Sequence, residues 1–223
     1  NPFLIISMLW LLLSNQSLAQ ESELIRFCQE NRFNPIDLSK KLKGKNPNTP
    51  TIRILKVYEK SLNGNYKGFI HDAAQLNSIK SQSINSPYIL HLKQLEVCEY
   101  YLLNGEFNAA KKGLERAVNF ARTKHENQWV SQAYRLYSKV YLYENKKDSS
   151  DLFIYRAIEF AKRSTNELEL ALCLHQSALN HAQFSNIQEA VTQELLALQV
   201  VEKLNNTYYE CIFNRFISEL SLD

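Results

Sequence analysis

The chain has 223 residues, of which 45% are hydrophobic and 22% are charged, proportions typical of a globular protein. Its net charge of +3 lacks the concentrated basic excess of a nucleic-acid-binding protein, so we expect no nucleic-acid partner. The chain has only five Gly and five Pro, which argues against a turn-rich all-β fold and favours long helices joined by short loops.

The N-terminal segment differs from the rest of the chain. Residues 3–13 form an apolar run that is interrupted only by Ser7. As a helix this run would span roughly 16 Å, about half of a ~30 Å hydrocarbon core. It therefore suits a signal peptide better than a transmembrane helix, and Ser17-Leu18-Ala19 offers small residues for cleavage.

We expect residues 1–19 to be a signal peptide that exports the protein to the periplasm or the cell exterior. The alternative is a buried N-terminal helix. A basic start is missing and the first residue is Asn1, so we expect the natural chain to begin earlier.

Residues 20–50 are predicted to form short capping helices and a linker. One or two helices fit residues 21–42, with Pro35 suited to a first helical turn. The sequence Lys-Gly-Lys-Asn-Pro-Asn-Thr-Pro at residues 43–50 is typical of a turn-rich linker.

From Cys98 onward the sequence repeats itself with a period of 40 residues, and the motif Leu-Asn-Gly-Asn-Tyr at residues 62–66 echoes Leu-Asn-Gly-Glu-Phe at residues 103–107. Small residues recur in three columns, and a larger apolar residue recurs in a fourth. The columns are Cys98, Ser138, Ala178 and Ser218; Ala110, Ser150 and Ala190; Ala117, Ala157 and Ala197; and Phe120, Phe160 and Val200. Small side chains let two helices approach closely, so the columns predict tightly packed helix pairs that stack into one core.

This spacing resembles the tetratricopeptide repeat. The best-matching unit carries the family pattern at Cys98, Tyr101, Gly105, Phe107, Ala110, Leu114 and Ala117. The resemblance implies an all-α fold, a right-handed α-solenoid of antiparallel helix pairs. The expected units are 51–82, 87–124, 127–164, 167–204 and a partial unit 207–223. The family repeat has 34 residues, so a period of 40 indicates longer helices or loops.

No residue pattern predicts catalysis, a cofactor or a metal site. His175 and His181 are six residues apart, which places them on opposite sides of a helix. The acidic residues Glu167 and Glu169 fit a helix start, where the helix dipole favours them. No phosphate-binding loop, nucleophile elbow or zinc motif is present. We therefore expect a protein that is not an enzyme, unless the N-terminal region hides a site.

The cysteines and tyrosines have simple structural interpretations. Cysteine occurs at positions 28, 98, 173 and 211 without metal-ligand spacing, and we expect buried free thiols. Tyr134, Tyr137 and Tyr141 follow the core stripe of one helix, so packing is expected, with a carbohydrate- or peptide-binding surface as the alternative.

The resemblance also implies a binding groove on the concave face, which is lined by the first helix of each unit. The polar groove residues are expected to be Glu99, Gln132, Arg135, Lys139, His175, Gln183 and Arg215. The set is more positive between Arg135 and Arg215, which favours an acidic peptide or a terminal carboxylate as ligand. The alternative is a groove that only holds solvent.

Two functions remain open from the sequence. The first is an exported scaffold that binds a peptide or protein partner in the concave groove. The second is the extracytoplasmic sensory part of a longer membrane-bound regulator, a histidine kinase or a transcriptional regulator. This second hypothesis depends on the last unit, which ends at Asp223 after a single helix, so that the natural chain is expected to continue.

Overall fold

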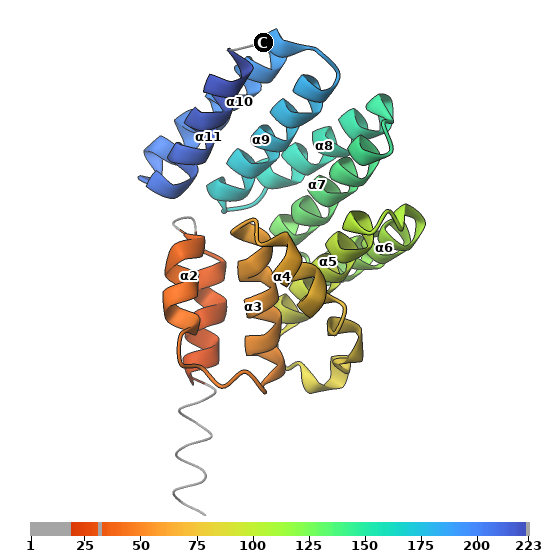
Figure 1. The fold of residues 1–223 in the computed structure, drawn as a ribbon, viewed down its shortest axis with the longest axis vertical. Coiled ribbons are helices and arrows are strands. Elements are labelled where there is room, and N and C mark those ends of the chain that lie inside the picture. Colours follow the sequence, from red (N-terminus) through yellow and green to blue (C-terminus); the bar gives the residue numbers. More distant parts are fainter. Residues whose placement is uncertain (1–18, 31–32, 222–223) are drawn as a thin grey trace, which may run out of the picture.

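The structure is a computed structural model that describes residues 19–30 and 33–221. The predicted signal peptide lies outside the described residues, except for its last residue. The described residues form helices and no strand, so the protein is all-α (Figure 1).

Short turns and loops separate the helices. Residues 19–28 form a first helix. The later helices are α2 (Pro35–Leu42), α3 (Pro50–Leu62), α4 (Tyr66–Ala73), α5 (Pro87–Leu103), α6 (Phe107–Thr123), α7 (Asn127–Tyr143), α8 (Lys147–Lys162), α9 (Glu167–Gln183), α10 (Ile187–Lys203) and α11 (Thr207–Leu220). Helices that are adjacent in sequence pack as pairs, α5 with α6, α7 with α8, and α9 with α10.

The 40-residue period is a structural repeat. Helices α5, α7, α9 and α11 begin at residues 87, 127, 167 and 207, and helices α6, α8 and α10 begin at 107, 147 and 187. The turns inside the pairs share one geometry, because Gly105, Asn145 and Ser185 have φ values of 75°, 57° and 60°. This left-handed conformation favours Gly and tolerates Asn, and it ends each first helix at the same place.

The small-residue columns lie between the paired helices, as predicted. All nine members within units 87–204 are buried. The hydroxyl of Ser138 donates to the carbonyl of Ser150 at 3.0 Å, and the reciprocal bond is also 3.0 Å long. At Gly113 an added Cβ would lie 2.5 Å from the Cys98 Sγ atom. Any larger residue at position 113 would therefore collide with the Cys98 side chain, which fills the space between α5 and α6.

The first predicted unit, 51–82, is shorter than the others. Helix α4 has eight residues, and two 3₁₀ turns (Leu76–Ser78 and Ser81–Ser83) follow it in place of a long second helix. Helix α3 packs on α2 and α5, so this unit still continues the stack.

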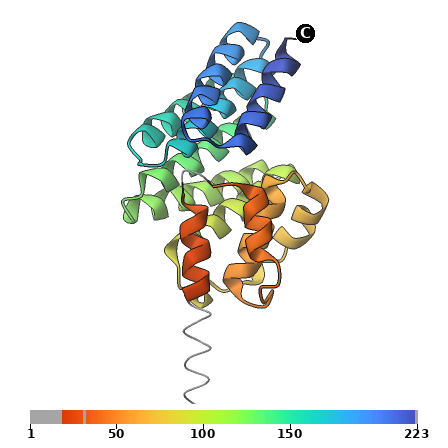
Figure 2. The same cartoon turned by 90° about the vertical axis from the view of Figure 1, so that its left-hand side faces the viewer.

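The N-terminal segment contacts the far end of the array. Asn166 and Asn206, at equivalent positions of two units, donate from Nδ2 to the carbonyls of Gln29 and Phe33, both at 3.0 Å. The Tyr208 hydroxyl donates to the Leu62 carbonyl at 3.3 Å. In Figures 1 and 2 the helices of residues 19–62 face the ends of α9 and α11. The array is therefore closed on this side by its own N-terminal helices.

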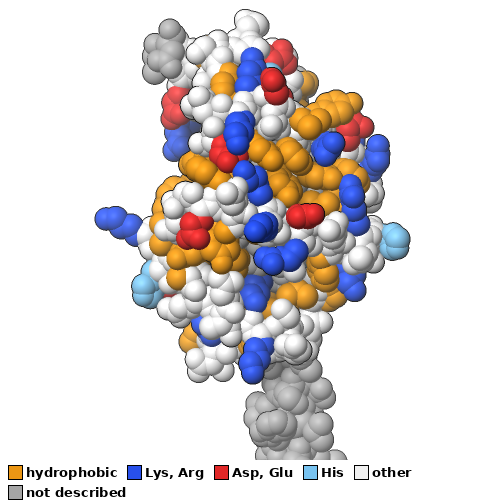
Figure 3. Space-filling model, turned by 90° about the vertical axis from the view of Figure 1, so that its right-hand side faces the viewer, with side chains coloured by type: hydrophobic (Ala, Val, Ile, Leu, Met, Phe, Trp, Pro, Cys, Tyr) orange, Lys and Arg blue, Asp and Glu red, His pale blue; other side chains and the backbone are white. Residues whose placement is uncertain are grey.

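The tyrosines of α7 pack as predicted. The Tyr137 and Tyr141 rings stack on Phe153 with centroids 4.6 and 5.2 Å apart, and Tyr134 is buried. The guanidinium of Arg156 lies 5.5 Å from the centroid of the same Phe153 ring. Apolar and basic side chains also lie next to one another on the face shown in Figure 3.

The cysteine prediction is confirmed at three positions and wrong at the fourth. Cys28, Cys98 and Cys173 are buried free thiols, whereas Cys211 is exposed. Cys211 lies on the side of α11 that no other described helix covers, so the apolar pattern of this helix gave a misleading indication of burial.

A candidate binding cavity on the inner helix row

The concave side of the array contains a cavity of about 260 Å³. We call α5, α7, α9 and α11 the inner row, and this space the inner cavity. Its lining repeats with the sequence period. Each inner helix contributes the residue at the same position of its unit to the wall, and these residues are Leu92, Gln132, Leu172 and Ile212. Equivalent positions point the same way because the four helices start in phase.

Other columns of the inner row also line the cavity. The full lining is Tyr58, Ser61, Leu62, Leu92, Leu95, Glu96, Glu99, Gln132, Arg135, Leu136, Lys139, Leu172, Gln176, Tyr208, Tyr209 and Ile212. Helix α3 supplies Tyr58, Ser61 and Leu62, so the first repeat unit forms part of the wall. The hydrogen bond from Tyr208 to Leu62 joins α11 to α3 at this wall. The concave side is thus a partly closed cavity and not an open groove.

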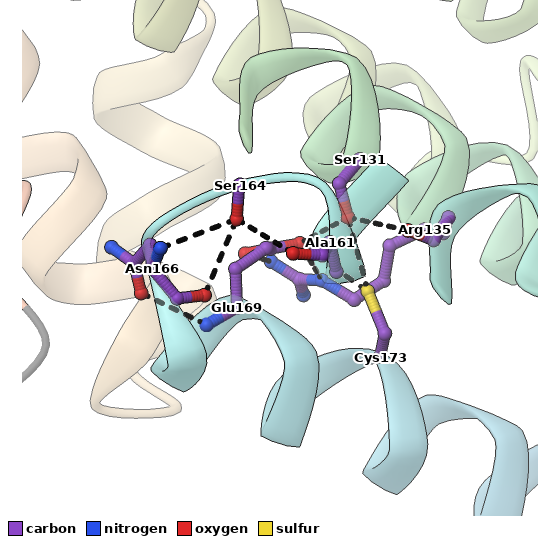
Figure 4. Close-up of polar contacts among 8 residues, drawn as sticks. Ser131, Arg135, Ala161, Ser164, Asn166, Glu169 and Cys173 are labelled. Atoms are coloured by element: carbon purple, nitrogen blue, oxygen red, sulfur yellow. Dashed lines mark hydrogen bonds and ion pairs between the residues drawn. The ribbon is translucent and has the colours of Figure 1, made fainter. Parts of the chain in front are cut away.

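One cation of the lining is held by a buried carboxylate. Arg135 donates from Nε and Nη2 to the two carboxylate oxygens of Glu169, at 3.0 and 3.2 Å. The Glu169 side chain is 2% exposed. Figure 4 shows Arg135, Ser131 and Cys173 gathered around this carboxylate near the start of α9. Burial lowers the pKa of Arg135, but the attraction of Glu169 outweighs it and raises the pKa overall.

The second cation is also paired. Lys139 forms an ion pair with Glu99, which occupies the equivalent position one unit earlier. Burial lowers the pKa of Lys139, and the charge and hydrogen bond of Glu99 more than compensate, so the pKa is raised. Both ion pairs cross between helices of the inner row and tie neighbouring units together.

Glu96 differs from the other carboxylates of the inner row. Its side chain is buried and lines the cavity, and its Oε2 atom has no hydrogen-bond partner among the described residues. Burial raises the pKa of Glu96 to about 8, and the negative charge of Glu99 adds to this effect, while Lys139 opposes it. The carboxyl is therefore mostly protonated at neutral pH.

Four of the seven predicted groove residues meet at the inner cavity. These are Glu99, Gln132, Arg135 and Lys139. Gln183 and Arg215 are exposed, and neither lines the cavity. His175 lies elsewhere because α11 covers it. Its ring stacks on Phe213 with centroids 4.8 Å apart, and its Nδ1 atom lies 2.8 Å from the buried Glu194 carboxylate.

Sequence reasoning missed two important carboxylates. Glu169 fits a helix start, but its side chain turns inward to Arg135. Glu96 lies between Leu95 and Val97 in a strongly apolar helix. An acidic residue among apolar neighbours is unusual, and this could have indicated a buried carboxylate. The contribution of α3 to the cavity wall had no signal in the local pattern.

The described residues contain no group of three His, Cys, Asp or Glu side chains placed to hold a metal ion. Burial raises the pKa of the Cys98 thiol to about 12, so it stays protonated at neutral pH and is a poor nucleophile. Within the same residues, no helix has the length and apolar character needed to cross a membrane.

Comparisons with known proteins give little further information. No protein family matches this sequence. No curated protein matches it either. Among solved structures, the crystal structure of BtubC (BKLC) from P. vanneervenii aligns with 85% of this chain and 72% of that chain, with 12% identity and a TM-score of 0.49. At this distance the alignment indicates nothing about what this chain binds.

Proposed function

We propose that the protein is an exported, non-enzymatic scaffold of the tetratricopeptide type, a right-handed solenoid that binds a peptide or protein partner on its concave side. The observation that supports this most is the inner cavity, which is lined by residues at equivalent positions of the inner-row helices. Apolar side chains alternate there with polar groups, the composition expected of a binding site.

The size of the cavity limits what enters it. Sites for drug-sized ligands typically occupy roughly 300–1,000 Å³, and this cavity has about 260 Å³. A whole helix or strand of the partner does not fit. We propose that one side chain or chain end of the partner enters the cavity, while its neighbours contact the rim.

An acidic ligand has less support than the sequence indicated. Arg135 and Lys139 are each already paired with a carboxylate of the protein itself. A carboxylate ligand would have to compete with Glu169 and Glu99 for those cations. Breaking such buried pairs costs several kcal/mol, about 3–5 by analogy with removal of one partner.

The test is a pair of matched substitutions that fill the cavity or leave it open. Leu136 lines the cavity, whereas Leu152 on α8 is 47% exposed. We expect Leu136→Trp to lower partner capture in a pull-down at least tenfold, because the indole occupies the space of the ligand. Leu152→Trp adds the same indole outside and should capture the partner like the unaltered protein. Equal capture by both variants would contradict the proposal.

A further inference from the structure

The inner cavity is lined by two cations, Arg135 and Lys139, and two carboxylates, Glu96 and Glu99. Arg135 pairs with Glu169, which does not line the cavity, and Lys139 pairs with Glu99. The ion pairs use Glu99 and Glu169, so Glu96 has no ion-pair partner of its own among the described residues. A buried carboxylate of this kind is expected to be paired, and in the free protein no described side chain fills that role.

From this arrangement we infer that the inner cavity binds a primary ammonium group on a flexible apolar stem, with Glu96 as its counter-charge. The inference rests on the proposed function and names the ligand chemistry of the same site. A lysine side chain of the partner is the source that fits a peptide-binding scaffold.

The cavity walls match both parts of such a ligand. Leu92, Leu95, Leu136, Leu172 and Ile212 surround the space with aliphatic side chains, against which the methylene stem can pack. The carboxyl of Glu96 is buried among them and accepts the charged end. An ammonium–carboxylate hydrogen bond in a buried site is stronger than one in water.

Other ligand classes fit less well. An anion would meet Glu96 and Glu99 and find both nearby cations already engaged. A guanidinium group presents five donors in a rigid fork, whereas the buried lining oxygens without a hydrogen-bond partner are two, Glu96 Oε2 and Gln132 Oε1. An ammonium group is compact and is satisfied by fewer acceptors.

In the free protein the Glu96 carboxyl is neutralised by a proton and not by a ligand. The pKa of Glu96 is raised to about 8, chiefly by burial, so the carboxyl carries a proton at pH 7. Binding of an ammonium ion would favour the charged carboxylate and release this proton. The other titratable groups that face the cavity are Glu99 on α5, Arg135 and Lys139 on α7, Tyr58 on α3, and Tyr208 and Tyr209 on α11. The first three are ion-paired, and burial raises the pKa of each tyrosine, so Glu96 is the group expected to lose its proton.

The experiment uses the full chain and three peptides, acetyl-Ala-Xaa-Ala-amide with lysine, norleucine or glutamate at the central position. Affinities are measured by NMR titration, and pentylammonium serves as a free amine. We expect the lysine peptide to bind at least tenfold more tightly than the norleucine peptide, and the glutamate peptide most weakly. Glu96→Gln should abolish the preference for lysine, while Glu115→Gln on the exposed surface of α6 should not change it.

Calorimetry in two buffers of different ionisation enthalpy tests the same inference without a variant. Close to one proton should be released for each lysine peptide bound at pH 7. Equal affinity for lysine and norleucine, or binding of lysine without proton release, would overturn the inference. Pentylammonium that binds as tightly as the lysine peptide would identify a free amine as the ligand, which supports the inference but contradicts a peptide partner.

The two proposals can fail separately. If Leu136→Trp abolishes partner capture but the lysine peptide does not bind, the ligand chemistry is wrong and the binding site stands. If the lysine peptide binds but Leu136→Trp leaves partner capture unchanged, the ammonium site stands and the proposed function is wrong.

Discussion

The inner row and the outer helices α6, α8 and α10 have the same period but bury different side chains. Helix α6 buries a single stripe, of which Ala110, Gly113 and Ala117 form the close contact with α5. Helix α5 buries residues around most of its circumference, including His91, Glu96 and Glu99. The outer helices thus make the pairs compact, and the inner helices carry the polar groups that give the cavity its chemistry.

This difference has an energetic consequence. A charged residue on the outer surface is solvated, so its ion pair contributes little to stability. A charge that lines the inner cavity has lost most of its water and depends on its partner, so removal of that partner is costly. The predictions below test this contrast, beginning with the largest expected effect.

Arg135→Leu should destabilise the protein by about 3–5 kcal/mol, because Glu169 would keep its burial and lose its counter-charge. Urea unfolding monitored by circular dichroism measures the change. Arg215 occupies the equivalent position two units later, but it is 75% exposed and pairs with the exposed Glu219. Arg215→Leu should therefore change stability by less than about 1 kcal/mol. Similar losses in the two variants would contradict the contrast between buried and exposed pairs.

Glu96→Gln should raise stability at pH 8 and have little effect at pH 4.5. In the unfolded chain this carboxyl has its ordinary pKa of 4.5, and in the folded protein its pKa is about 8. The folded state therefore binds more protons between these values, and stability falls as pH rises through that window. The glutamine variant lacks this loss, so at pH 8 it should be more stable by about 2–4 kcal/mol. The measurement is urea unfolding at both pH values, and a pH-independent difference would contradict a buried, unpaired Glu96.

Gly113→Ala should destabilise the protein by about 1–3 kcal/mol, although alanine is the better helix former. The added Cβ would lie 2.5 Å from the Cys98 Sγ atom, so the sulfur occupies the space that the alanine needs. Cys98→Ala in the same chain removes the sulfur and should restore most of the loss. Thermal unfolding compares the single and double variants, and an unaffected single variant would contradict a Cys98 side chain held in place against Gly113.

Asn206→Ala should cost about 1 kcal/mol, because it removes both the cap of α11 and the hydrogen bond to the Phe33 carbonyl. Hydrogen exchange in residues 33–42 should also become faster, since the N-terminal cap loses a contact with the array. Asn186 precedes α10 but makes no side-chain capping bond. Asn186→Ala is thus the control and should leave stability within about 0.5 kcal/mol.

The sequence was sufficient for the pairing of the helices because the relevant information is local. Side-chain volume at Ala117, Ala157 and Ala197 decides how close two helices lie, and volume can be read from the residue itself. The helix starts at 87, 127, 167 and 207 follow from the same repeated pattern.

The closure of the array was not predictable in the same way. The bonds from Asn166 and Asn206 to Gln29 and Phe33 join residues more than 130 positions apart. A repeat pattern shows which face of each helix points inward, but the curvature of the stack decides which faces meet. His175 shows why the repeat pattern alone is not sufficient. It occupies the position equivalent to Arg135 one unit later, yet Phe213 of α11 covers it.

The central claim is that the partner enters the inner cavity, and photo-crosslinking tests it most directly. A diazirine side chain of leucine size is placed at position 136, inside the cavity, or at position 152 on the outer face of α8. The account predicts that the partner is crosslinked from position 136 and not from position 152. Crosslinking from position 152 alone would place the partner on the outer helices and contradict the account.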